Sequence, residues 1–204
     1  MTWYADEILL RATSAAVDAL AAWPAVSAFA YVVRDLTGHD WHAPEIRHGL
    51  PADGLLVIRP VCGSDSHSRD WYGTAVLEWA AVASANTGRL DSGVTRLLAE
   101  NLDELSRPPA SFRAALAALA RQLSQPVVFY SCCTHGGTVI QEFSLIYEPA
   151  ESLLVKSDLH GEIADDGAEP LRSGLAKLEL TLPTPYFAPH TRSFPWQKYR
   201  WVPR

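Results

Sequence analysis

The sequence predicts an α+β fold, in which a mixed, largely antiparallel sheet of about five strands packs against three to four helices. The chain has 204 residues, of which 48% are apolar, so it can build a sizeable core. Helical periodicity and strand-like composition occupy separate stretches of the chain. No repeat or linker divides it, and we therefore expect residues 1–204 to form a single globular domain.

The N-terminal quarter is expected to form one helix and two strands. Residues 5–22 place apolar side chains at helical spacing, and Pro24 ends that pattern, which predicts an amphipathic first helix. The segments Val26–Arg34 and Gly54–Val61 are rich in β-branched or aromatic residues and are predicted strands. Between them, Asp35–Asp53 has the glycines and prolines of a long loop that can face a partner.

Three more helices are expected before residue 124. Residues 70–87 are apolar on most sides, which favours a buried helix. Val94–Leu105 and Phe112–Leu123 each show a leucine-rich stripe at helical spacing.

Strand character follows Pro126. Val127–Cys133, Thr138–Tyr147 and Ser152–Ser157 are separated by turn residues, which predicts a three-stranded antiparallel meander. A short helix is expected over Pro170–Leu180. Residues 183–204 combine prolines with many aromatic residues, and we expect an extended C-terminal arm whose rings pack on the domain.

Charge and cysteine content narrow the functional classes. The formal net charge of -6 argues against nucleic-acid binding, which needs a basic surface. The first ten residues lack a basic leader, and the most apolar stretch, Ala15–Val33, contains Asp18 and Pro24, so neither a secretion signal nor a membrane span is predicted. Three cysteines fit reduced thiols, and the expected location is cytoplasmic.

A histidine-rich segment offers possible metal ligands. His39, His42 and His48 lie close to Asp40 and Glu45 in the predicted loop. Their spacing matches no mechanistic metal motif, and a loop does not hold ligands in register as a helix does. We therefore predict no metal site. No glycine-rich nucleotide loop follows a strand, so no cofactor is predicted either.

Two segments carry a cysteine near a histidine, as nucleophilic catalysis requires. Cys62 and His67 enclose a Gly-Ser-Asp-Ser run, and Cys132-Cys133 precede His135 and two glycines. Adjacent strand residues point to opposite faces, and the glycines have a sufficient role in turns. No catalytic residue is predicted, although a small hydrolase or transferase using Cys133 or Cys62 with a nearby histidine is the alternative.

The stretch Asp158–Glu169 contains five carboxylates and no Lys or Arg. Such a segment is either a solvated loop or a negative patch that attracts a basic partner. We interpret Asp165, Asp166 and Glu169 as the candidate partner-binding residues.

The segment 126–147, PVVFYSCCTHGGTVIQEFSLIY, resembles the late hairpin of some bacterial immunity proteins. These proteins place a strand, a Gly-Gly turn and an aromatic strand ahead of a short helix and the C-terminal end, in the order seen here. The resemblance implies a small cytosolic protein that binds and neutralises a toxin, with no catalysis of its own. The expected partner is a protein, such as a toxin with a basic surface, and an accessory or structural role in a larger assembly is the further alternative.

Overall fold

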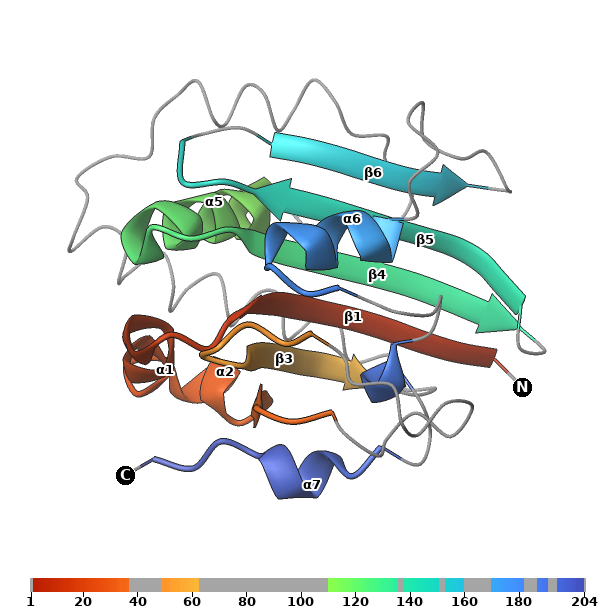
Figure 1. Ribbon diagram of the computed structural model, residues 1–204. Helices are drawn as coiled ribbons and strands as arrows, with labels where there is room; N and C mark the ends of the chain where they lie inside the picture. Colours follow the sequence, from red (N-terminus) through yellow and green to blue (C-terminus); the bar gives the residue numbers. More distant parts are fainter. Residues whose placement is uncertain are drawn as a thin grey trace.

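The computed structural model contains a six-stranded sheet in the order β2-β3-β1-β4-β5-β6, in which every neighbouring pair is antiparallel (Figure 1). Its strands are β1 (Thr2–Arg11), β2 (Ala30–Val33), β3 (Leu55–Cys62), β4 (Val127–His135), β5 (Thr138–Tyr147) and β6 (Leu153–Leu159). The structure describes residues 2–36, 49–62, 110–135, 138–150, 153–159, 170–181, 187–190 and 194–203. The predicted α+β fold is confirmed, with a sheet larger than the expected five strands and no parallel pair among the described strands.

The expected first helix over residues 5–22 is wrong for its first half, which is strand β1. This strand lies inside the sheet between β3 and β4, so its backbone pairs on both edges. Ala5, Leu9, Ile8 and Leu10 are all buried because both faces of the strand are covered. A strand buried on both faces lacks apolar-polar alternation, and its long-range pairing overrides the helical preference of Ala, Leu and Glu.

The helix that does form is α1 (Ser14–Leu20). Thr13 caps it, since its hydroxyl accepts a hydrogen bond from the Ala16 backbone N–H at 3.3 Å. The next predicted strand, Val26–Arg34, is shared between the short helix α2 (Pro24–Ser27) and β2. Pro24 begins α2, where its missing N–H is no loss.

The central pair of strands carries a β-bulge. In β1, Asp6 pairs with Val61 and Ile8 pairs with Ile58, so the single residue Glu7 faces two residues of β3. One of these is Pro60, which cannot donate a ladder hydrogen bond and is tolerated in a sheet at such a bulge. The predicted strand Gly54–Val61 is confirmed and continues past the proline to Cys62.

The second half of the chain follows the sequence prediction closely. β4, β5 and β6 form the expected meander. Helix α5 (Ala110–Leu123) corresponds to the predicted Phe112–Leu123 stripe, and α6 (Pro170–Lys177) to the expected short helix. The predicted helices over 70–87 and 94–105 and most of the loop Asp35–Asp53 lie outside the described residues.

Two apolar clusters sandwich the sheet. On one face, here called the α5 face, side chains such as Ile8, Ile58 and Phe129 pack against α1, α2 and α5. On the opposite face, the arm face, Leu9 and Val57 belong to a second buried cluster. Helix α6 lies over β4 and β5 on that face (Figure 1). The structure thus has helical cover on both sides of an antiparallel sheet.

Helix α6 sits unusually close to the sheet. A Cβ atom at Gly174 would lie 2.7 Å from a methyl carbon of Val128 in β4, so the site admits only glycine without a shift. The Ser144 hydroxyl donates to the Pro170 carbonyl at 2.8 Å and fixes the start of the helix. Close packing and this buried hydrogen bond together hold α6 on the arm face.

The C-terminal arm, meaning described residues 187–190 and 194–203, covers the rest of the arm face. It contains the 3-10 helix η1 (Ala188–His190) and the short helix α7 (Trp196–Tyr199). Phe187, Phe194 and Tyr199 are buried in the cluster of that face. The arm then runs beside the edge strand β2, where the Trp201 N–H donates to the Ala30 carbonyl at 2.9 Å. Among the described residues, no helix is long and apolar enough to cross a membrane.

Candidate functional site

A buried carboxylate lies on the arm face of the sheet. Glu7 in β1 has no solvent exposure, and the bulge described above sets it opposite Arg59 and Pro60 of β3. Burying an unpaired carboxylate costs several kcal/mol. The structure must therefore supply positive partners for Glu7.

Both oxygens of Glu7 are paired. Arg59 Nε donates to Oε1 at 2.6 Å, from a guanidinium whose side chain is also buried. His190 of η1 lies 2.7 Å from Oε2 through its Nε2. An ionised carboxylate can only accept, so the imidazole Nε2 donates this bond. Burial raises the pKa of Glu7, but His190 and Arg59 outweigh it, and the pKa falls from 4.5 to about 2.

Aromatic rings surround the two partners of Glu7. The guanidinium carbon of Arg59 lies 3.8 Å from the centre of the Trp196 ring, a cation-π contact with the arm. Tyr130 of β4 stacks on His190 with ring centres 5.4 Å apart, and Phe187 meets the same imidazole edge-on at 4.8 Å. We call Glu7, Arg59, His190, Tyr130 and Trp196 the Glu7 cluster.

The Glu7 cluster continues along β4 and β5 through the hydroxyl of Tyr130. The Tyr130 hydroxyl donates to Glu142 Oε2 at 2.7 Å. Burial raises the pKa of Tyr130 well above its usual value, with Cys132 and Glu142 acting in the same direction. Burial also raises the pKa of the Cys132 thiol to about 12, helped by the negative charges of Glu7 and Glu142. Both groups are therefore neutral at physiological pH.

The chemistry available to these residues is limited. A histidine oriented by a carboxylate is one part of a nucleophilic catalytic site, but it needs an activated nucleophile beside it. Cys132 is only 5% exposed and is a thiol rather than a thiolate. Tyr130 is a neutral phenol engaged by Glu142. Among the described side chains, the Glu7 cluster works as an internal clamp that ties the arm to the sheet.

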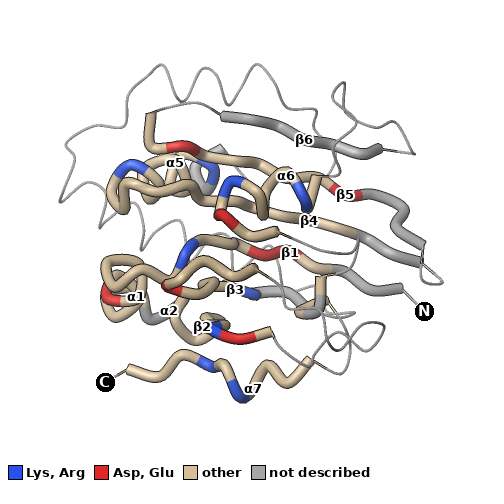
Figure 2. The backbone as a smooth tube through the Cα atoms, in the orientation of Figure 1, with Lys and Arg blue, Asp and Glu red and all other residues tan. Residues whose placement is uncertain are grey.

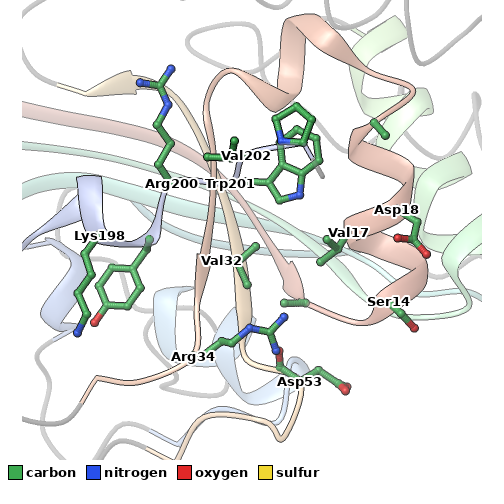
Figure 3. Close-up of a pocket in the computed structure, with 14 residues that line it drawn as sticks. Ser14, Val17, Asp18, Val32, Arg34, Asp53, Lys198, Arg200, Trp201 and Val202 are labelled. Atoms are coloured by element: carbon green, nitrogen blue, oxygen red, sulfur yellow. The ribbon is translucent and has the colours of Figure 1, made fainter.

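A groove opens on the protein surface where the end of the arm passes α1 and β2 (Figure 3). Its volume is about 810 Å³. Val17 of α1, Val32 of β2 and Trp201 of the arm line it with apolar surface. Arg34, Lys198 and Arg200 are exposed at its margins. The arm thus builds one wall of the groove and the body of the domain builds the other.

The cysteines singled out in the sequence come to one end of the sheet. Ala5 of β1 pairs with Cys62 on one side and with Cys132 on the other, and Tyr4 pairs with Cys133. The Cα atoms of Cys62 and Cys132 are therefore two strand spacings apart, about 10 Å. A disulfide spans at most about 7 Å between Cα atoms, so this register does not link them.

The other predicted site residues are not brought into any described site. The acidic candidates Asp165, Asp166 and Glu169 lie outside the described residues, as do His39, His42, His48 and His67. The side chains of Cys62, Cys133 and His135 are likewise outside the described set. Within the described part of the chain, no group of three or more His, Cys, Asp or Glu residues could hold a metal ion.

Sequence reasoning missed the Glu7 cluster. Interpreted as part of a helix, Glu7 is an ordinary surface residue, whereas on a strand it shares a buried face with Ala5 and Leu9. Because residues on both faces of β1 are buried, the sequence carries no alternation that would have marked Glu7 as buried. His190 gave no signal either, because it is separated from Glu7 by 183 positions along the chain.

We predict that Glu7→Gln destabilises the fold by about 3 kcal/mol at neutral pH, because buried Arg59 then loses its contact with the Glu7 carboxylate. The pKa of Glu7 is lower in the folded state, at about 2, than its usual 4.5. Its charge therefore stabilises the fold above pH 4.5, and this contribution is lost as the pH falls towards 2. Urea denaturation at several pH values should show that the variant lacks this acid dependence.

Asp18→Asn, at an exposed position of α1, is the control and should leave stability unchanged. If the unfolding free energy of Glu7→Gln lies within about 0.5 kcal/mol of the parent's, the Glu7 cluster does not stabilise the fold.

We predict that Cys132 is unreactive in the folded protein. In a Cys62→Ser/Cys133→Ser background, iodoacetamide at neutral pH should label it only at the rate at which the fold opens, because a buried thiol with a pKa of about 12 supplies almost no thiolate. The same chain in denaturant should react at the rate of a free thiol. Rapid stoichiometric labelling of the folded protein would mean that Cys132 is an accessible nucleophile.

In comparisons with protein-family models, curated proteins and solved structures, nothing matches this chain.

Proposed function

We propose that this chain is a protein-binding module that binds and neutralises a bacterial toxin effector, as immunity proteins do. One observation carries the proposal: the buried ionisable groups of the arm face form hydrogen bonds with one another, and these bonds hold the arm on the sheet. Glu7 has both oxygens bonded, and Tyr130 donates to Glu142. A clamp of this kind suits a protein whose surface, and not a reactive centre, performs the function.

A fixed surface favours binding. Binding partners lose less conformational entropy when the contact surface is already ordered. The arm is held by His190 and Trp196 at one end and by the Trp201 N–H at the other. The groove beside it is therefore formed before a partner arrives, and its apolar lining can receive an anchoring side chain.

The resemblance of the β4-β5 hairpin to immunity proteins supports the same proposal, as does the net charge of -6. Toxins that attack nucleic acid need basic surfaces to hold phosphates. An acidic inhibitor is electrostatically complementary to such a surface. In this proposal Asp165, Asp166 and Glu169 lie at the rim of the interface and steer the toxin towards the chain.

A cysteine-dependent hydrolase or transferase is the second candidate function. The observation that favours it is the register that pairs Cys62 with Ala5 and Cys133 with Tyr4, two and three residues along β1 from Glu7. Rapid iodoacetamide labelling of Cys133 that depends on His135 would favour this enzyme over the binding module.

We predict that the variant Asp165→Lys/Asp166→Lys/Glu169→Lys associates several-fold more slowly with the toxin that the proposed function expects to be encoded beside its gene. Rim charges act mainly on the encounter rate, so the difference should shrink as ionic strength rises. Stopped-flow measurements at low and high salt give both values. In cells, co-expression of the parent chain should restore growth in the presence of that toxin.

The control is Asp35→Lys/Glu148→Lys/Glu179→Lys, which makes the same change in net charge outside the acidic segment and also removes the ion pairs of Glu148 with Lys177 and of Glu179 with Arg11, so its folding is confirmed by thermal melting. If the control associates as slowly as the test variant, the effect comes from overall charge alone. If the test variant associates at the parent's rate, the acidic segment lies outside the interface. A toxin that neither binds nor is neutralised would overturn the proposed function.

A further inference from the structure

The groove beside the arm differs in charge from the chain as a whole. The described segment 194–203 contains Lys198 and Arg200 and no acidic residue, as the blue sections around α7 show (Figure 2). Arg34 adds a third cation from the end of β2. Three exposed cations therefore gather at one groove of a protein whose formal net charge is -6.

The acidic residues of the groove do not cancel these cations. The carboxylate of Asp53 accepts from Arg11 at 2.7 Å, and Arg34 donates to the backbone carbonyl of Asp53 at 3.2 Å. Asp18 lies on α1, across the groove from Lys198 (Figure 3). Within the described part of the chain, Lys198 and Arg200 form no ion pair with a carboxylate.

The groove combines this positive rim with apolar surface. Trp201 is half-buried and packs against the core of the α5 face, while Val202 is 69% exposed. Val202 is the exposed large apolar side chain among the described residues, and it lines the groove together with the half-buried ring of Trp201. An occupant that matches both features carries carboxylates next to an aliphatic or aromatic side chain.

We propose that the groove binds an acidic segment of the toxin partner, with its carboxylates at Lys198, Arg200 and Arg34 and an apolar side chain against Trp201 and Val202. This inference rests on the proposed function, since it names a second contact of the same partner. The occupant is a protein segment rather than a nucleic acid, because nucleic-acid binding draws on many phosphate contacts and this chain is acidic overall.

The test uses the full chain and a defined probe, a fluorescent peptide that alternates aspartate and tryptophan. Fluorescence anisotropy should detect binding that weakens as salt rises, because exposed charges contribute to it. Lys198→Glu/Arg200→Glu should weaken binding about tenfold, since each carboxylate then meets a like charge. The matched control, Arg172→Glu/Lys177→Glu on α6, makes the same charge change away from the groove and should bind as the parent does, with thermal melting confirming that each variant folds.

The outcomes separate this inference from the proposed function. Absence of peptide binding to the parent chain, or equal loss in both variants, would overturn the groove as an acidic-segment site. Stronger binding of a single-stranded oligonucleotide with the same dependence on Lys198 and Arg200 would overturn it in favour of a phosphate ligand. Peptide binding that depends on the groove cations, from a chain that fails to bind the neighbouring toxin, would support the groove and count against the proposed toxin.

Discussion

The need to neutralise one buried carboxylate organises the arm face of this protein. Glu7 lies inside a six-stranded sheet with no access to water, where an unpaired charge is strongly unfavourable. Arg59 supplies one cation from the adjacent strand, but the second oxygen is satisfied by His190, at the other end of the chain. The C-terminal arm is therefore held on the sheet by the charge of Glu7 in β1. The rings of Tyr130 and Phe187 contact His190, and the ring of Trp196 contacts Arg59.

The contacts of Glu7 also fix the position of the groove at which we propose that a partner binds. The arm, fixed by His190 and Trp196, continues along the edge of β2, and its residues Lys198, Arg200 and Trp201 line the groove that α1 borders on the other side. The cations there come from a tail without acids, whereas the five carboxylates of 158–169 lie in a different part of the chain. In the proposed function, a partner with both basic and acidic surfaces would contact the acidic segment and the cations of the groove together, which would provide orientation as well as attraction.

Features set by residues close together in the sequence could be predicted from it, whereas features set by residues far apart could not. The β4-β5-β6 meander and helices α5 and α6 were predictable, because turn residues and 3.6-residue periodicity are local signals. Strand β1 was predicted as a helix, because burial of both its faces erases the alternation that marks a strand. The pairing of Glu7 with His190 could not be predicted, since no local pattern connects two residues 183 positions apart. The cysteines were noticed for their chemistry, but the burial that raises the pKa of Cys132 is a property of the folded sheet.

The claim that Glu7 clamps the arm through His190 is tested most directly by a double-mutant cycle on unfolding free energy, using Glu7→Gln, His190→Ala and the two combined. If the two side chains act on one another as described, their effects overlap, and the coupling free energy should be about 1–3 kcal/mol. Effects that add within about 0.5 kcal/mol would show that the two residues contribute independently, and would contradict the clamp.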